Sequence, residues 1–152
     1  MDYDDWGTTP EFFTFLNHIW GPFTVDRFAD SDNTKLTRFY SKFHCPHSEG
    51  VDAFNFSWAR EHNYLVPPVH LVPATLKHLE FYQAEGVLVV PYWTSSIFYP
   101  LLLDTAHTFK YFIQEAMFFD NGHTCVFQGR DESCFIGSPH FKSGILAMKI
   151  TF

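Results

Sequence analysis

The 152-residue chain has only three cysteines, Cys45, Cys125 and Cys134, and their odd number and spacing indicate no disulfide framework. No apolar run approaches the ~18 residues that a membrane-spanning helix needs. The first ten residues, MDYDDWGTTP, are acidic and lack the apolar segment of a secretory signal. We therefore expect an intracellular protein, cytoplasmic or nuclear, with no membrane partner.

Positive charge is also scarce, with 10 Lys and Arg side chains against 17 Asp and Glu and a net charge of −7. Strong non-specific DNA binding relies on basic surface, so this balance argues against strong nucleic-acid affinity of the chain on its own. Lys35, Arg38 and Lys42 would share one face if their segment were helical. Such a run is more often a solvated face than a phosphate-binding one, and salt-dependent binding would distinguish the two.

Several common functional motifs are missing. The segment HCPH brings His44, Cys45 and His47 together, but zinc needs four ligands, usually as two spaced pairs, and no second pair accompanies them. No G-x-S-x-G elbow supports a hydrolase, and no G-x-G follows the first expected strand. The sequence thus predicts no metal site, no hydrolase triad and no glycine-rich dinucleotide loop.

Aromatic residues are abundant, with 19 Phe, and 46% of the chain is hydrophobic. This composition favours a folded globule over disorder, and the length suits one domain spanning residues 1–152. A helix is expected from Pro10 to the residue before Gly21, because Thr9 can cap it and Pro10 suits its first position. Further helices are expected over 72–83 and within 95–104.

Strands are expected over 23–28, before the prolines at 67–68, and over 87–91, a continuous apolar run typical of a strand buried on both faces. The last third predicts strands within 110–119, 124–130 and 144–152, separated by turns. The alternation of helices and strands predicts an α/β fold, a mostly parallel sheet with helices on both faces and antiparallel C-terminal strands at one edge. Ligands of such sheets bind outside the carboxyl ends of the strands.

The order of short motifs resembles that of phage-type Dam DNA adenine-N6 methyltransferases, which run W-x-T-P, D-x-x-A, Asn, Asp, Trp, N-P-P-Y, a strand ending in Pro, Trp and G-R. The corresponding residues are Trp6, Thr9, Pro10, the DRFA of 26–29, Asn33, Asp52, Trp58, the VPPV of 66–69, the VVP of 89–91, Trp93, Gly129 and Arg130. Residues 6–103 are more closely similar to the Dam-like domain of DIRS/Ngaro-type retroelement polyproteins, in phrases such as WGPFTVDRFADSDNTKLTRFYSKF, NYLVPPVHLVPATLKHLE and GVLVVPYWTSSIFYPLL.

This resemblance implies a Rossmann-like methyltransferase sheet and S-adenosylmethionine as cofactor. The cofactor-binding positions that it implies are Asp26, Ala29, Asn33 and Asp52. Arg130 would contact DNA phosphate, with Lys35 and Arg38 as further nucleic-acid candidates. Each acidic residue also has an ordinary alternative, because short acidic side chains commonly bind backbone amides in the following loop.

The catalytic loop departs from the family pattern. Val66, Pro67, Pro68 and Val69 stand at the N-P-P-Y positions. Valine cannot accept a hydrogen bond from the adenine amino group, and an unpaired amino group costs roughly 1–3 kcal/mol. Losing the aromatic that stacks on the base costs about as much again.

We therefore expect a degenerate, inactive methyltransferase-like domain with an accessory role in the replication of a retroelement. Its partners would be weakly bound DNA or other domains of the polyprotein, and its cofactor binding could be retained or lost. Two alternatives stay open. One is an active S-adenosylmethionine-dependent adenine methyltransferase, in which Tyr64 or His70 replaces the lost groups. The other is a scaffold with no nucleic-acid role.

Overall fold

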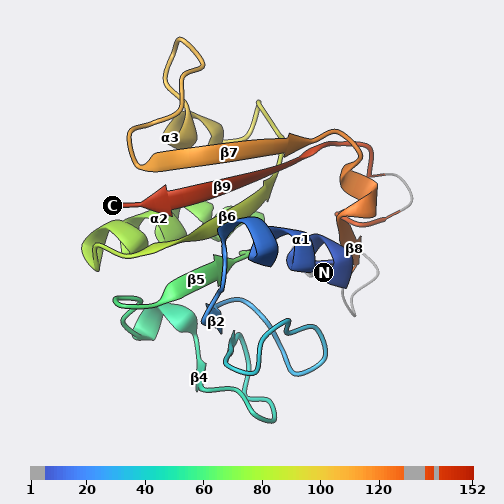
Figure 1. Cartoon of the computed structure of the whole chain (residues 1–152), viewed down its shortest axis with the longest axis vertical. Coiled ribbons are helices and arrows are strands. Elements are labelled where there is room, and N and C mark those ends of the chain that lie inside the picture. The colour runs from blue at the N-terminus through green and yellow to red at the C-terminus, as the bar shows by residue number, and fades with distance from the viewer. Residues whose placement is uncertain (1–5, 129–135, 139–140) are drawn as a thin grey trace.

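The computed structural model describes residues 6–128, 136–138 and 141–152, and a five-stranded mixed sheet lies at its centre (Figure 1). The strand order is β2 (Val25–Asp26), β5 (His62–Leu65), β6 (Glu85–Pro91), β9 (Ile145–Thr151) and β7 (Ile113–Phe119). The first three strands are parallel. Strand β9 is antiparallel to both β6 and β7, so β7 points the same way as β6.

A second, small parallel sheet continues the first beyond β2. It pairs β3 (Tyr40–Ser41) with β4 (Gly50–Val51). A single parallel bridge joins Asp26 to Phe39, and the Ala29 N–H donates to the Tyr40 carbonyl at 3.0 Å. Across both sheets the strand order is therefore β4–β3–β2–β5–β6–β9–β7.

Helices cover both faces of the sheet. Successive residues of a strand point to opposite faces, and the central strands carry apolar side chains on both, so each face is buried against a helix. Helix α1 (Pro10–Trp20) packs Leu16 and Trp20 with Val87, Val89 and other residues of one face. Helices α2 (Val72–Phe81) and α3 (Tyr99–Leu102) pack on the other face, which includes Leu88 and Val90. Burying apolar side chains on both faces explains why the β6 segment is apolar at nearly every position.

A short antiparallel ribbon lies beside α1. It pairs β1 (Trp6–Thr8) with β8 (Val126–Gln128), two segments that are far apart in the sequence. Three 3₁₀ turns complete the described structure: η1 (Ala53–Asn55), η2 (Val69–Leu71) and η3 (Gly122–Thr124). The turn η2 follows the two prolines and leads directly into α2, so the proline pair forms the corner between β5 and that helix.

The expected α/β class, the parallel strands and the helices on both faces are observed. Of the C-terminal strands expected to be antiparallel at one edge, β9 and β7 form an antiparallel pair there, and only β9 runs against β6. The strand expected within 124–130 does not join this sheet, because β8 pairs with β1 instead. Helix α1 has the expected ends, with the Thr9 Oγ1 accepting the Phe12 N–H at 3.3 Å. Strand β2 is shorter than the expected 23–28, because Asp26 binds the next amides through its side chain. Helix α2 ends at Phe81 rather than at residue 83, since Gln83 adopts a φ of 49°.

The helical spacing of Lys35, Arg38 and Lys42 is not realised. Residues 30–50 form turns and the short strand β3. The carbonyls of Arg38 and Tyr40 accept hydrogen bonds from the Asp26 and Ala29 amides, which is the pairing of a strand beside β2. These long-range bonds hold the segment extended, so the three cations do not share a helix face.

Candidate functional site

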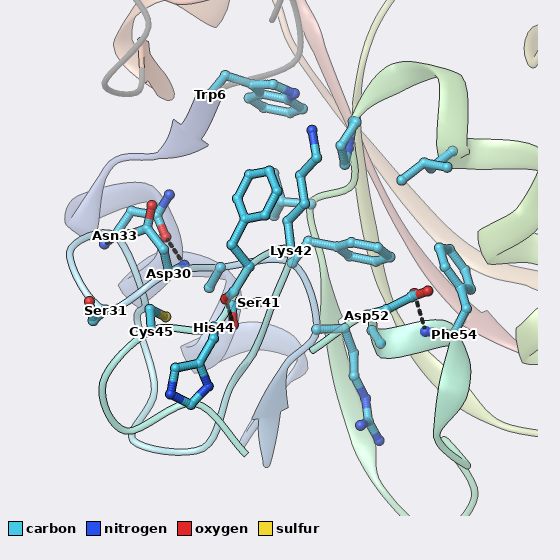
Figure 2. Close-up of a pocket in the computed structure, with 18 of the residues that line it drawn as sticks. Trp6, Asp30, Ser31, Asn33, Ser41, Lys42, His44, Cys45, Asp52 and Phe54 are labelled. Atoms are coloured by element: carbon cyan, nitrogen blue, oxygen red, sulfur yellow. Dashed lines mark hydrogen bonds between the residues drawn. The ribbon is translucent and has the colours of Figure 1, made fainter. Parts of the chain in front are cut away.

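A cavity of about 770 Å³ lies outside the carboxyl ends of four parallel strands (Figure 2). Its walls come from segments that follow β2, β3, β4 and β5, and Trp6 of β1 completes them. The chain runs outward from β2 through β3 and β4, then returns to β5 on the other side of β2. The strand order therefore reverses between β2 and β5, the place where open α/β sheets bind ligands.

Five of the eight predicted catalytic and cofactor-binding residues line this cavity together: Ala29, Asn33, Asp52, Val66 and Pro68. They come from three separate segments, and only the fold brings them to one place. Other predicted residues are not in its walls, namely Asp26, Lys35, Arg38, Pro67, Val69 and Trp93. Arg130 lies outside the described residues.

Asp26, the last residue of β2, lies behind the cavity wall and is 3% exposed. Its carboxylate accepts the Phe28 and Lys35 backbone amides, both at 3.4 Å. Burial raises the pKa of Asp26 to about 6, against the opposing effect of these two amides. The carboxylate thus closes the loop that forms one wall, which is the ordinary alternative foreseen for it, and its direct contact with a cofactor stays a prediction.

The loop closed by Asp26 is held by a second acidic residue. The Asp30 Oδ1 accepts the amides of Asp32 and Asn33, at 2.8 and 2.9 Å. In return the Asn33 Oδ1 accepts the Asp30 amide at 2.7 Å. Asn33 is therefore fixed in the wall by hydrogen bonds within its own loop, while its amide nitrogen remains a donor for a ligand.

Asp52 stands on the opposite wall, directly after β4 (Figure 2). Its φ of 65° lies in the left-handed region, and its Oδ1 accepts the Phe54 amide at 3.1 Å at the start of η1. The residue is exposed, so the second carboxylate oxygen can accept hydrogen bonds from a bound molecule. Asp52 is thus the acidic side chain of the predicted set that the structure places in the cavity.

Val66 and Val69, which replace the Asn and Tyr of the N-P-P-Y pattern, are apolar residues and also lie in apolar surroundings. Val66 is 6% exposed and packs into the cluster on the α1 face, which includes Tyr64, Val87 and Val89. Val69 packs against the apolar clusters of both faces. Tyr64 does not line the cavity, and its hydroxyl is 2.6 Å from that of Thr8, whereas His70 does line it.

The predicted nucleic-acid contacts are already engaged within the protein. Arg38 forms ion pairs with Glu49 at 2.8 Å and with Glu61 at 2.7 Å. The Lys35 ammonium donates to the Asn33 carbonyl at 2.8 Å and lies over the Phe127 ring. To bind a DNA phosphate, Arg38 would have to break its ion pairs with Glu49 and Glu61, which makes it a less favourable DNA contact.

Sequence reasoning assigned no role to several side chains of the walls, among them Trp6, Phe43 and Phe54. Trp6 belongs to the W-x-T-P motif, which was the one available signal for it. Its side chain is 5% exposed, and its indole Nε1 has no hydrogen-bond partner among the residues that the structure describes. Phe43 lies in an irregular segment and Phe54 in the short turn η1, and in neither does a periodic pattern indicate which side chains point inward.

Neither a metal cluster nor a known relative assigns a chemistry to this cavity. Within residues 6–128, 136–138 and 141–152, no group of three or more His, Cys, Asp or Glu side chains could hold a metal ion. In those same residues, no helix has the length and apolar character needed to cross a membrane. No protein-family model matches the chain, and the search of curated proteins found no match.

Proposed function

We propose that the chain is a catalytically degenerate DNA adenine-N6 methyltransferase-like domain that retains a pocket for S-adenosylmethionine. The observation that carries the proposal is the convergence of Ala29, Asn33, Asp52, Val66 and Pro68 on one cavity. Their positions in the sequence are those of the motifs in the methyltransferase family. Residues taken at random from three loops would not be expected to line the same cavity.

The sheet supports the same proposal. Joined through the Asp26–Phe39 bridge, its order is β4–β3–β2–β5–β6–β9–β7, with β9 the single strand that runs against the others. A last strand inserted antiparallel between two strands that point with the rest is typical of S-adenosylmethionine-dependent methyltransferases. The cavity then lies at the strand ends where such sheets take their cofactor.

The cavity also has the size and side chains that a nucleoside cofactor needs. Its volume of about 770 Å³ falls within the range of small-molecule sites. Phe28 and Phe54 provide apolar walls, and the free oxygen of Asp52 can accept from ribose hydroxyls or an exocyclic amine. The bound cofactor would supply an activated methyl group, and Asp52 and Asn33 would orient the nucleoside.

Methyl transfer is the part of the activity that the side chains do not support. Val66 offers no acceptor for an adenine amino group and is committed to the apolar cluster behind it. Val69 offers no ring for base stacking. We infer that a flipped adenine is not held, so the active-enzyme alternative is the weaker one.

An accessory role in a retroelement polyprotein follows from the resemblance over residues 6–103. The low count of basic side chains and the ion pairs of Arg38 favour protein contacts over strong DNA binding in that role. Weak DNA contact would show as affinity that falls steeply with added salt.

Isothermal calorimetry with S-adenosylmethionine and S-adenosylhomocysteine tests the pocket, and transfer of labelled methyl groups to adenine-containing DNA tests catalysis. We expect saturable binding of both compounds and no transfer above that of a boiled sample. Asp52→Asn should weaken binding about tenfold, as expected for a charged hydrogen bond. Asp104→Asn is the matched control, because the Asp104 carboxylate also accepts backbone amides in an exposed turn but lies away from the cavity.

Two results would count against the proposal in different ways. An absence of heat at millimolar concentrations of both compounds would exclude a surviving cofactor pocket. Methyl transfer to DNA would instead exclude the degenerate assignment and establish the enzyme.

A further inference from the structure

We propose that Phe43 is the ring on which the base of the bound nucleoside stacks. The inference rests on the proposed function for the nature of the ligand. It goes beyond that function by naming the residue that holds the planar part of the ligand, a residue for which the sequence predicted no role.

The first observation is the exposure of Phe43. The residue lines the cavity and is 71% exposed, although phenylalanine usually buries most of its surface. The Lys42 ammonium lies over the ring, 5.3 Å from its centroid, and most of the remaining ring surface is open. An apolar surface left open beside a cavity is typical of a place where a ligand binds.

The other phenylalanines of the cavity walls differ from Phe43 in their packing. The ring of Phe28 lies 5.6 Å from that of Phe54 and 6.0 Å from that of Trp58, between ring centroids. The ring of Phe54 also packs against that of Trp58, at 5.6 Å. Phe28 and Phe54 are therefore held within the protein, whereas the ring of Phe43 offers its surface to a ligand.

The second observation is the position of Phe43 between the polar residues of the proposed pocket. Strand β3 lies between β4 and β2. Phe43 comes two residues after β3, Asp52 directly follows β4, and Asn33 is in the loop after β2. Asn33 and Asp52 stand on different walls (Figure 2). A ligand that reaches from one of these walls to the other therefore passes Phe43.

The third observation is that the backbone at Phe43 is fixed. Ser41, the last residue of β3, is 3% exposed, and its Oγ donates to the Phe43 carbonyl at 2.6 Å. The Asp52 N–H donates to the Ser41 carbonyl at 2.9 Å, so the segment that carries the ring is joined to the segment that carries the acceptor. A ring projected from a fixed backbone loses little freedom when a ligand binds.

A nucleoside base suits this arrangement because it has apolar faces and polar edges. Every base can stack on an aromatic side chain through its face, whatever hydrogen bonds its edge makes. The free oxygen of Asp52 and the amide nitrogen of Asn33 can then bind the edge of the base or the ribose hydroxyls. Phe43 thus supplies the face contact, and the two polar residues supply the orientation.

Three variants of Phe43 test the contact by calorimetry with S-adenosylhomocysteine and adenosine. Phe43→Ala removes the ring and should lower both affinities about tenfold. Phe43→Leu keeps an apolar side chain without a ring and should also bind both compounds more weakly than the parent. Phe43→Tyr keeps the ring and should bind them as the parent does. Phe81→Ala is the matched control, because Phe81 is 78% exposed on α2 and does not line the cavity.

Proton NMR of the bound ligand distinguishes stacking from a general effect on the pocket. A ring stacked on the base shifts the adenine H2 and H8 resonances upfield. We expect these resonances of bound adenosine to lie further upfield with the parent and Phe43→Tyr than with Phe43→Leu. Equal positions in the parent and Phe43→Leu would show that the ring does not lie over the base, and would overturn the inference.

The binding results separate this inference from the proposed function. Unchanged affinity of Phe43→Ala for both compounds would overturn the stacking role and leave the nucleoside pocket standing. A loss in Phe43→Tyr as large as that in Phe43→Ala would also overturn it, since the ring is retained. Binding of neither compound by the parent would overturn both the inference and the proposed pocket.

Discussion

The hydroxyl oxygens of Thr8 and Tyr64 lie 2.6 Å apart in the interior of the protein, and they join the β1–β8 ribbon to β5. Tyr64 is 1% exposed, and its ring contacts those of Phe13 and Phe23. Burial raises the pKa of Tyr64 above its ordinary value, so the phenol stays protonated and one hydroxyl donates to the other. This bond fixes the residue two positions before the proline loop and leaves its hydroxyl occupied.

Removing either hydroxyl should destabilise the protein. Tyr64→Phe and Thr8→Val are each expected to lower the free energy of unfolding by about 1–2 kcal/mol, because the remaining hydroxyl is left buried and unpaired. The double variant should lose less than the sum of the two, since it leaves no orphaned group. Chemical denaturation measures all three, and Tyr111→Phe, at an exposed ring, should be close to neutral. Strict additivity would show that the two hydroxyls are not coupled.

The raised pKa of Asp26 predicts a pH-dependent stability. Its folded value of about 6 exceeds the ordinary 3.8, so between these values the folded state binds more protons than the unfolded chain. The contribution of Asp26 to stability is therefore lost as pH rises from about 4 to 6, by up to about 3 kcal/mol. Asp26→Asn should be more stable than the parent at pH 7, and the advantage should vanish near pH 4.

Thermal or urea unfolding at several pH values measures this difference. Asp104→Asn reports the effect of removing a carboxylate from an exposed turn. An Asp26→Asn variant that is less stable than the parent at pH 7 would mean that the Phe28 and Lys35 amides stabilise the ionised carboxylate by more than its burial costs.

Arg27 should be intolerant of lysine. Its guanidinium is buried, donates to the Asn63 Oδ1 at 2.8 Å and to the Ser57 carbonyl at 3.2 Å, and lies over the rings of Tyr40 and Trp58. Lysine keeps the charge but cannot make the planar, forked contact. We expect Arg27→Lys to cost about 2–4 kcal/mol in the free energy of unfolding, as for other losses in buried charged networks.

Arg60→Lys, at an exposed position, is the control for Arg27→Lys. Denaturant unfolding of the two variants side by side gives the comparison. Similar stabilities would show that the buried charge, rather than the shape of the guanidinium, is what the site requires.

Placing Asn, the first residue of the N-P-P-Y pattern, at position 66 should not confer adenine methylation. Val66→Asn places an amide in the apolar cluster with Tyr64 and Val87, and an unpaired polar group there should cost about 1–3 kcal/mol. Binding of S-adenosylhomocysteine by calorimetry should persist, since the substitution leaves Asp52 in place. Val51→Asn, at a partly exposed site of β4, should cost less. Adenine methylation by Val66→Asn with Val69→Tyr would contradict this view and show that two substitutions alone removed the activity.

Local signals account for what was predictable from the sequence. The ends of helix α1 are marked in the sequence by Thr9, Pro10 and Gly21. Strand β6 is buried on both faces, so its sequence is one continuous apolar run. Strands β3 and β4 have two residues each and no periodicity. Only hydrogen bonds to distant segments define them, so neither was foreseen.

The order of motifs in the sequence predicted some of the residues that line the candidate site, but not all of them. Asn33, Asp52 and Val66 were identified by motif and do meet at one cavity, whereas the inward position of Asp26 depends on the amides of Phe28 and Lys35. The Trp6 N–H has no acceptor within residues 6–128, 136–138 and 141–152, and no residue pattern could predict this, because it depends on which atoms surround the indole in the folded protein.

The attachment of the β3–β4 sheet has a consequence for motion. Only one bridge, Asp26–Phe39, and a few neighbouring backbone bonds join it to the main sheet, whereas β6 and β9 pair along seven residues. Regions with few such bonds open most readily. Amides of residues 39–52 should therefore exchange with deuterium well before those of 85–91. Because this sheet carries Lys42 and Asp52 into the cavity, a bound nucleoside should slow that exchange more than any other in the protein.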